Sequence, residues 1–178
     1  MKKHIAFLLA TMLMATMACA QHGGGDKSKR PSPPASAACK FTDGKSIAVD
    51  YSSPRAKGRK IFGDVVPLGK EWRTGANEAT TFESTANLSI GNLAIPAGKY
   101  TMYTIPGEKS WKLIINKQTG QWGTEYDEKQ DLGRADMEVS KTSGPVENFT
   151  ISFHEMGKGC HMYLDWENTR ATVEIGEK

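Results

Sequence analysis

"FTISFHEMGKGCHMYLDW", residues 149–166, is the stretch that decides the fold. Its apolar residues recur at every second position on both sides of a short Gly-containing segment, at Phe149, Ile151, Phe153, Met162, Leu164 and Trp166. A period of two places successive side chains on opposite faces of a strand. We therefore predict two antiparallel strands joined by a tight turn at 156–159, with one apolar and one polar face. This register places His154 opposite His161 and Glu155 opposite Cys160.

The same alternation recurs along the rest of the chain. It marks apolar faces at Ile47, Val49 and Tyr51, at Trp111, Leu113 and Ile115, at Ala135, Met137 and Val139, and at Ala171, Val173 and Ile175. Turn residues separate these runs, and "WENTR", residues 166–170, reads as the last short turn. Helical patterns are weak. We predict an all-β fold, an antiparallel β-sandwich of eight to ten strands, immunoglobulin-like or jelly-roll-like, with a closed barrel as the alternative.

The first twenty residues, "MKKHIAFLLATMLMATMACA", are typical of a signal peptide. Lys2 and Lys3 precede a short apolar run, and Ala18-Cys19-Ala20 supplies the small residues of a cleavage site. The run is shorter than the ~20 apolar residues that span a bilayer. We expect cleavage after Ala20 and an exported, periplasmic or secreted protein. The alternative is a lipoprotein with an N-terminal lipid anchor at Cys19.

Residues 21–38, "QHGGGDKSKRPSPPASAA", contain no large apolar side chain. Such a composition predicts a disordered linker, which leaves residues 39–178 as the folded domain. This domain holds 18 basic and 19 acidic residues once the signal and the linker are excluded. A net charge of −1 gives no electrostatic reason to expect nucleic acid as a partner.

Cys39 and Cys160 are the two cysteines of the domain. Each shares the parity of inward-facing neighbours, and an exported protein meets an oxidising environment. We therefore predict that a core disulfide joins them, with two separate buried thiols as the alternative.

Few residue patterns indicate catalysis. His154 and His161 would be neighbours, but a zinc site needs at least a third ligand. No nucleophile elbow or phosphate loop occurs, and we predict no catalytic residue, metal or cofactor. The basic segment with Arg55, Lys57, Arg59 and Lys60 is either a solvated loop or a contact for an anion such as a phosphate or an acidic sugar.

The block "WRTGANEAT", residues 72–80, concentrates unusual residues between two apolar runs. Gly75 suits a turn with positive φ, Asn77 can bond the local backbone, and Arg73 with Glu78 would form an ion pair. We interpret the block as a structural corner. The alternative is a ligand pocket built from Trp72, Arg73, Asn77 and Glu78. Aromatic residues suited to a sugar-binding platform are Trp72, Tyr103, Trp122, Tyr126 and Tyr163.

Four blocks together resemble a family of exported bacterial proteins called domain of unknown function 2911. They are "SPRAKGRKIFGDVVPLGKEWRTGANEAT", "LAIPAGKYTMYTIPGEKSWKLIINK", "QWGTEYDEKQDLGR" and "PVENFTISF". The resemblance runs from about Phe41 to Val173. It implies a signal peptide and a compact β-rich domain, and it carries no established activity. The two cysteines are not part of these blocks.

These observations favour a non-catalytic binding or envelope-associated module, whose partner is a small molecule or an envelope glycan. One alternative is an envelope hydrolase that uses Glu78 with a second carboxylate or a His. Another is a structural component of an envelope assembly.

Overall fold

The computed structural model describes residues 26–178. Within them the chain forms nine strands and two short 3-10 helices, η1 (Lys27–Lys29) and η2 (Glu128–Gln130). The strands are β1 (Pro34–Lys40), β2 (Ser46–Ser52), β3 (Thr81–Ser84), β4 (Leu88–Ile90), β5 (Leu93–Ile95), β6 (Gly98–Ile105), β7 (Ser110–Asn116), β8 (Asp131–Glu155) and β9 (Gly159–Glu177). The predicted signal peptide, residues 1–20, and the alternative anchor at Cys19 lie outside the described residues.

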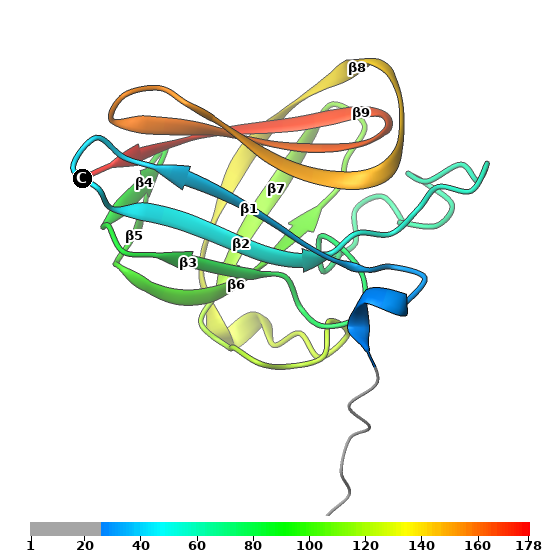
Figure 1. Ribbon diagram of the computed structural model, residues 1–178, viewed down its shortest axis with the longest axis horizontal. Helices are drawn as coiled ribbons and strands as arrows, with labels where there is room; N and C mark the ends of the chain where they lie inside the picture. Colours follow the sequence, from blue (N-terminus) through cyan, green and yellow to red (C-terminus); the bar gives the residue numbers. More distant parts are fainter. Residues whose placement is uncertain (1–25) are drawn as a thin grey trace, which may run out of the picture.

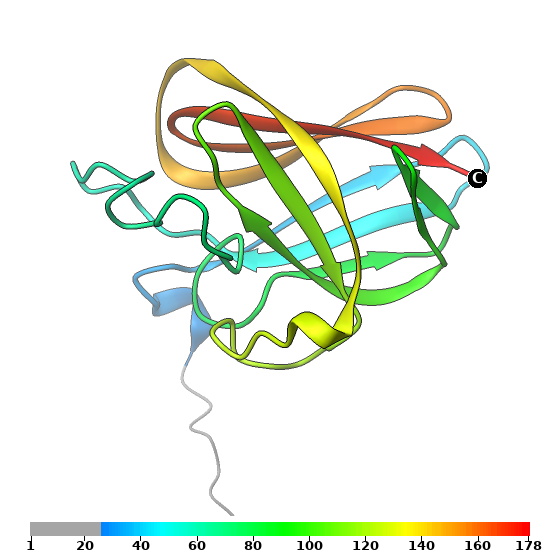
Figure 2. The ribbon, with the colours of Figure 1, turned by 180° about the vertical axis from the view of Figure 1, so that it is seen from behind.

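The strands of residues 26–178 form one sheet in the order β1-β2-β3-β6-β7-β8-β9-β4-β5. All neighbouring pairs are antiparallel. The sheet curves around the core, so that β1, β2 and β3 form one side (Figure 1), and β7, β8 and the β4–β5 hairpin form the other (Figure 2). The predicted antiparallel all-β fold is confirmed. Its two layers belong to one continuous sheet, whose order ends at β1 and β5 and is therefore not closed into a barrel.

β8 and β9 form a long ribbon that folds back on itself. β8 has 25 residues and β9 has 19. Lys141 pairs with Thr169, whereas the next paired residue of β8, Val146, pairs with Glu167, which has a φ of 57°. The extra residues on β8 make a bulge, which bends paired strands. Figure 1 shows both strands reversing direction at this end. The predicted turn at 166–170 is therefore a bend within β9 rather than a loop between two strands.

The apolar residues predicted to face inward are buried or partly buried in one core. The predicted hairpin register is also confirmed, because His154 pairs with His161. At one end of the core, five aromatic rings pack with centroids 4.9–6.4 Å apart, those of Phe62, Trp72, Trp111, Phe149 and Trp166. Burial of such large side chains supplies the main favourable term in folding.

The N-terminal segment corrects the predicted linker. Pro34–Lys40 form β1, which pairs with β2 from Pro34↔Ser52 to Lys40↔Ser46. Backbone hydrogen bonds hold this edge strand, so small side chains such as Ala35 and Ala37 suffice on its inner face. The composition predicted disorder because it counts apolar side chains and not backbone pairing. The linker residues 21–25 lie outside the described residues.

A disulfide joins Cys39 on β1 to Cys160 on β9, with the two Cα atoms 6.5 Å apart. Both cysteines are fully buried. The pairing that the sequence indicated is thus present in the structure. It fixes the edge strand β1 to the β8–β9 ribbon.

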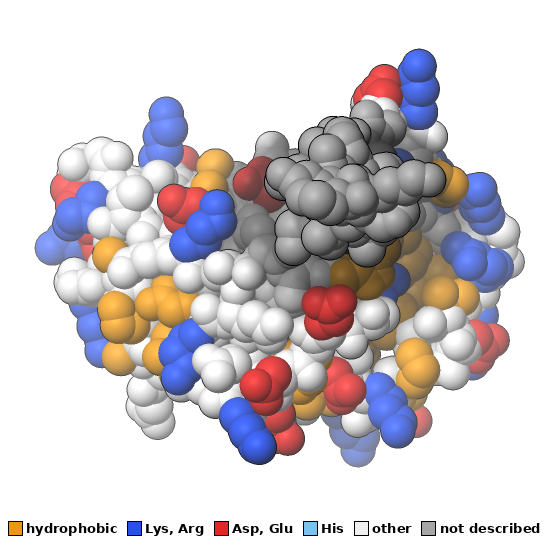
Figure 3. All heavy atoms as spheres, turned by 90° about the horizontal axis from the view of Figure 1, so that it is seen from below, with side chains coloured by type: hydrophobic (Ala, Val, Ile, Leu, Met, Phe, Trp, Pro, Cys, Tyr) orange, Lys and Arg blue, Asp and Glu red, His pale blue; other side chains and the backbone are white. Residues whose placement is uncertain are grey.

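The surface mixes charges of both signs. On the face seen in Figure 3, basic and acidic side chains are interspersed around hydrophobic ones. This pattern agrees with the near-neutral charge of the folded domain. Between residues 26 and 178, no helix has the length and apolar character needed to cross a membrane.

Candidate functional site

The block at residues 72–80 is a corner that directly precedes β3 and is hydrogen-bonded to β2 and β6. Trp72 exchanges two backbone hydrogen bonds with Thr104 of β6, at 2.8 and 2.9 Å. Ala76 N donates to Ser52 O at the end of β2, at 3.1 Å. The block is therefore fixed to two strands through its backbone.

The corner has an unusual backbone conformation. Thr74, Gly75 and Asn77 have φ values of 52°, 155° and 60°. A Cβ at Gly75 would lie 3.0 Å from Ser52 O and 3.1 Å from Thr80 Oγ1, so glycine fits here without displacing a neighbour. The Thr80 hydroxyl donates to Thr74 O at 2.8 Å inside the corner. The block is a structural corner, and the remaining question is which side chains it presents outward.

Glu78 is held by the N-terminal segment. Arg30 Nη1 donates to both carboxylate oxygens at 2.9 Å, and Lys27 Nζ lies 3.0 Å from Oε1. Burial alone would raise the pKa of Glu78, but hydrogen bonds from its own backbone N–H, from Arg30 and from Lys27 lower it to about 2. The predicted ion pair between Arg73 and Glu78 is therefore wrong. The actual partners come from residues that the sequence assigned to the linker.

Asn77 and Trp72 also have structural partners. Asn77 Nδ2 donates to Ser32 O at 3.1 Å and so holds the N-terminal segment as well. Trp72 Nε1 donates to Gly75 O at 3.1 Å, and its ring stacks on Trp166 with centroids 5.8 Å apart. The four residues of the predicted pocket thus face different surroundings.

Within residues 26–178, the Arg73 side chain makes neither a hydrogen bond nor an ion pair. Its Nε is buried and makes no hydrogen bond, and Arg73 forms no ion pair with any residue from 26 to 178. Burial lowers the pKa of Arg73, an effect that the nearby Tyr103 partly offsets. A buried N–H without a partner is uncommon in native structures and calls for an explanation.

Arg73 lines a pocket of about 200 Å³. Three segments form its walls: the corner, β6, and the loop that precedes η2. The lining residues are Glu71, Trp72, Arg73, Tyr103, Gly123, Thr124 and Tyr126. Glu71 and Thr124 are exposed, so the pocket opens to solvent.

Two tyrosines stand beside the guanidinium. The rings of Tyr103 and Tyr126 lie 4.8 Å apart between centroids. Gln121 Nε2 donates to the Tyr103 hydroxyl at 3.2 Å, and the Tyr126 hydroxyl donates to Asp131 Oδ2 at 2.8 Å. Burial raises the pKa of both tyrosines, and the Asp131 carboxylate raises that of Tyr126 further. Both phenols are therefore neutral at physiological pH.

Gly123 makes room for Arg73. A Cβ at Gly123 would collide with Arg73 Cδ and would lie 2.7 Å from Asn77 O. Gly123 N donates to that same carbonyl at 3.0 Å, so the loop cannot easily retreat. Sequence reasoning missed Gly123 as a site residue. The available signal was its position inside "QWGTEY", residues 121–126, one of the blocks that carry the family resemblance.

Part of the predicted aromatic platform meets at this pocket. Trp72, Tyr103 and Tyr126 line it together. Trp122 directly precedes Gly123 and is 46% exposed. Tyr163 lies on β9 and does not line the pocket.

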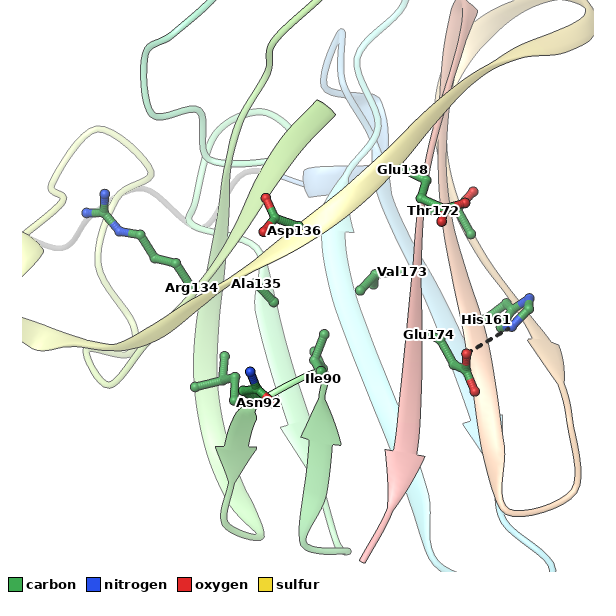
Figure 4. Close-up of a pocket in the computed structure, with 12 residues that line it drawn as sticks. Ile90, Asn92, Arg134, Ala135, Asp136, Glu138, His161, Thr172, Val173 and Glu174 are labelled. Atoms are coloured by element: carbon green, nitrogen blue, oxygen red, sulfur yellow. Dashed lines mark ion pairs between the residues drawn. The ribbon is translucent and has the colours of Figure 1, made fainter. Parts of the chain in front are cut away.

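A wider hollow of about 670 Å³ lies between the β4–β5 turn, β8 and β9 (Figure 4). His161 Nε2 and Glu174 Oε2 face each other there at 4.0 Å. Asp136 and Glu138 stand apart from that pair, and Arg134 points away. The ionisable side chains that line this hollow therefore do not converge on one point. Across the described part of the chain, no group of three or more His, Cys, Asp or Glu residues is placed to hold a metal ion.

The chain matches the profile of a family described as protein of unknown function (DUF2911) over residues 32–175, and it belongs to this family. No curated protein and no solved structure matches it. Three of the sequence blocks that carry the resemblance contribute residues to the Arg73 pocket, through Arg73, Tyr103 and Gly123.

Proposed function

We propose that this member of the family is an exported binding module that captures the anionic end of a small molecule, or of an envelope glycan, at Arg73. The signal-like residues 1–20 support export to the periplasm or the medium, with lipid anchoring at Cys19 as the alternative. The pocket around Arg73 supports binding.

One observation carries the proposal: the Arg73 guanidinium is partly buried with an unpaired Nε. A buried polar group without a partner costs roughly 1–3 kcal/mol, more when it is charged. An anion in the pocket would supply the missing acceptor. It would also offset the burial that lowers the pKa of Arg73.

The guanidinium and the volume of the pocket restrict the kinds of ligand that it can bind. A guanidinium presents a planar fork of N–H donors that matches a carboxylate or a phosphate. A volume of about 200 Å³ admits such a group with a few neighbouring atoms. The rest of the ligand would then extend over the pocket mouth at Glu71 and Thr124. The exposed ring of Trp122 offers a surface on which a sugar could stack.

Glu78 is a poor candidate for the proton donor of a hydrolase. A general acid needs a pKa near or above the working pH, and the pKa of Glu78 is about 2. Its carboxylate is also engaged by Arg30 and Lys27. We therefore place ligand contact at Arg73 rather than at Glu78.

The test is a titration of the purified protein with small anions: acetate, glucuronate, inorganic phosphate and a sugar phosphate. Isothermal calorimetry gives the affinity, and the NMR signal of the Arg73 Nε–H reports the site. Arg73→Met should weaken binding by ~10–100-fold, because a hydrogen bond to a charged group contributes about 1.5–3 kcal/mol. Arg73→Lys should recover part of the affinity, since it keeps the charge but loses the fork.

Two matched variants sharpen the result. Glu78→Gln changes a charge five positions away and should leave the affinity unaltered. Gly123→Ala keeps every charge but displaces Arg73, so it should weaken binding. If none of the anions binds, or if Arg73→Met binds them as tightly as the unmodified protein, Arg73 is not the recognition group.

A further inference from the structure

A second group of cations lies outside the Arg73 pocket, on the segment between β2 and β3. This segment projects from the sheet in Figure 1. A hollow of about 420 Å³ is lined there by Pro31, Ser32, Pro54, Arg55, Lys57 and Arg59. Half of its lining residues are therefore basic.

The two arginines of this hollow are held in place by neutral groups. Arg55 Nη1 donates to Asn148 Oδ1 at 3.0 Å. Arg59 donates from Nε to Ala56 O at 2.9 Å and from Nη2 to Arg55 O at 2.7 Å. Ala56 N is bonded in turn to Glu147 O at 2.8 Å. Because these contacts are already made, little ordering entropy remains to be lost when a ligand binds.

A tight turn presents Lys57 beside them. Lys57 and Gly58 have φ values of 50° and 68°, and Arg59 N donates to Ala56 O at 3.1 Å. Two successive residues with positive φ are typical of a type I′ turn, in which a lysine is strained by roughly 1–2 kcal/mol. The Lys57 backbone N–H donates to Glu147 Oε1 at 2.9 Å, which fixes the turn.

The hollow has an excess of positive charge. Among residues 26–178, the side chains of Arg55, Lys57 and Arg59 form no ion pair with a carboxylate. Glu147 contacts the same turn, where its Oε1 accepts from the Lys57 backbone N–H. One carboxylate therefore stands against three cations. Three neighbouring cations repel one another, and an anion with more than one negative charge would relieve that repulsion. The hollow therefore favours a ligand with more than one negative charge, whereas the Arg73 pocket, with a single guanidinium, does not require one.

We propose that this hollow binds a phosphate group, carried either by a soluble phosphorylated molecule or by a lipid headgroup. The guanidinium N–H groups that these contacts leave free can donate charge-assisted hydrogen bonds to phosphate oxygens, and lysine adds a further charge. Two exposed aliphatic residues of the same segment, Val65 and Leu68, would touch the membrane if the source is a headgroup.

The first experiment titrates the purified protein with pyrophosphate and follows the arginine Nε–H signals by NMR at low and high salt. The Arg55 and Arg59 signals should shift saturably, and the affinity should fall as salt rises. Arg59→Gln should weaken binding by about 10-fold or more, which corresponds to the loss of a charge-assisted hydrogen bond. Lys117→Gln removes an exposed lysine elsewhere and should leave the affinity unchanged.

Lys57→Asn separates loss of binding from loss of folding. Asparagine tolerates positive φ better than lysine, so this variant should fold at least as stably while it binds pyrophosphate more weakly. Failure of pyrophosphate to bind together with failure of anionic vesicles to bind would overturn the proposal. So would affinities that Arg59→Gln and Lys57→Asn leave unchanged.

Vesicles distinguish the two sources of phosphate. Binding to phosphatidylglycerol vesicles but not to phosphatidylcholine vesicles, weakened by Val65→Ser with Leu68→Ser, supports a headgroup. Binding of pyrophosphate without binding to either vesicle supports a soluble phosphorylated ligand. These readouts do not depend on Arg73, so the proposed function and this inference can fail separately.

Discussion

Arg73 and Glu78 are five residues apart in one corner, yet the Glu78 carboxylate has charged partners and the Arg73 guanidinium has none among residues 26–178. Glu78 has two cationic partners from the N-terminal segment and a pKa of about 2. Arg73 has a buried Nε that finds no hydrogen-bond acceptor in the described part of the chain. An ion pair explains why Glu78 is placed where it is, whereas a buried N–H donor without a partner still calls for an explanation. The Glu78 side therefore has a structural role, and the unpaired donor on the Arg73 side is the basis for proposing that a ligand binds there.

The largest expected effect on stability comes from removing the disulfide that holds β1, next to the Glu78 side of the corner, to the rest of the fold. The Cys39–Cys160 disulfide closes a loop with a sequence separation of 121 and pins β1, which follows the segment that holds Glu78. Replacing both cysteines by serine should lower the free energy of unfolding by ~4–5 kcal/mol in the chain-entropy model. Urea unfolding with and without reductant measures this, and an equal midpoint in both conditions would show that the bond contributes nothing.

Next in size is a change that disturbs both sides of the corner together. Gly75→Ala places a Cβ at 3.0 Å from Ser52 O at a φ of 155°. We expect a loss of about 1–3 kcal/mol, because the backbone strain and the close contact must be relieved. Thermal unfolding measures the loss, and Gly69→Ala is the control, since its Cβ would meet nothing within 4 Å. Equal losses in the two variants would show that only φ matters.

A smaller effect is expected when the satisfied side loses its charge. Glu78→Gln should cost at most ~1 kcal/mol at neutral pH, because the side chain is 38% exposed and solvent screens the pairs. The folded pKa of about 2 lies below the ordinary glutamate pKa of 4.5, so this contribution is present above pH 4.5. It should be lost as the pH falls from 4.5 toward 2. Stability curves of the two proteins should converge over that interval, and parallel curves would contradict the assignment.

The smallest effect on stability is expected at the unsatisfied side. Arg73→Met keeps most of the apolar stem and removes an unpaired buried N–H, so stability should change by less than about 0.5 kcal/mol, or rise. Chemical unfolding checks this. A loss of several kcal/mol would mean that Arg73 has a structural role after all, and the contrast with Glu78 would disappear.

The sequence predicted the layers better than the edges. Strict alternation identified the buried faces around Ile47, Trp111, Phe149 and Met162, because a half-buried strand leaves that signal in side-chain polarity. Residues 34–38 of β1 were assigned to the linker, because an edge strand held by its backbone and a disulfide needs few apolar side chains. Backbone hydrogen bonds leave no signal in the residue types, because every residue except proline has the same backbone N–H and C=O groups.

The candidate site was predicted in part. "WRTGANEAT" was identified as a corner, and Tyr103 and Tyr126 were named as binding aromatics. The Arg73–Glu78 pair was wrong because three positive φ values turn the two side chains toward different neighbours. Gly123 was missed because it contributes to the site by lacking a side chain, which leaves space for Arg73. Only the packed structure can reveal such a role.

The path of β9 bears on when this chain can fold. Its residues near 177 pair with β4, its middle pairs with β8, and its beginning is bonded to β1. Neither layer is complete before that strand has been made, and folds dominated by distant contacts form slowly. We therefore expect the nascent chain to complete its fold only after β9 has been synthesised.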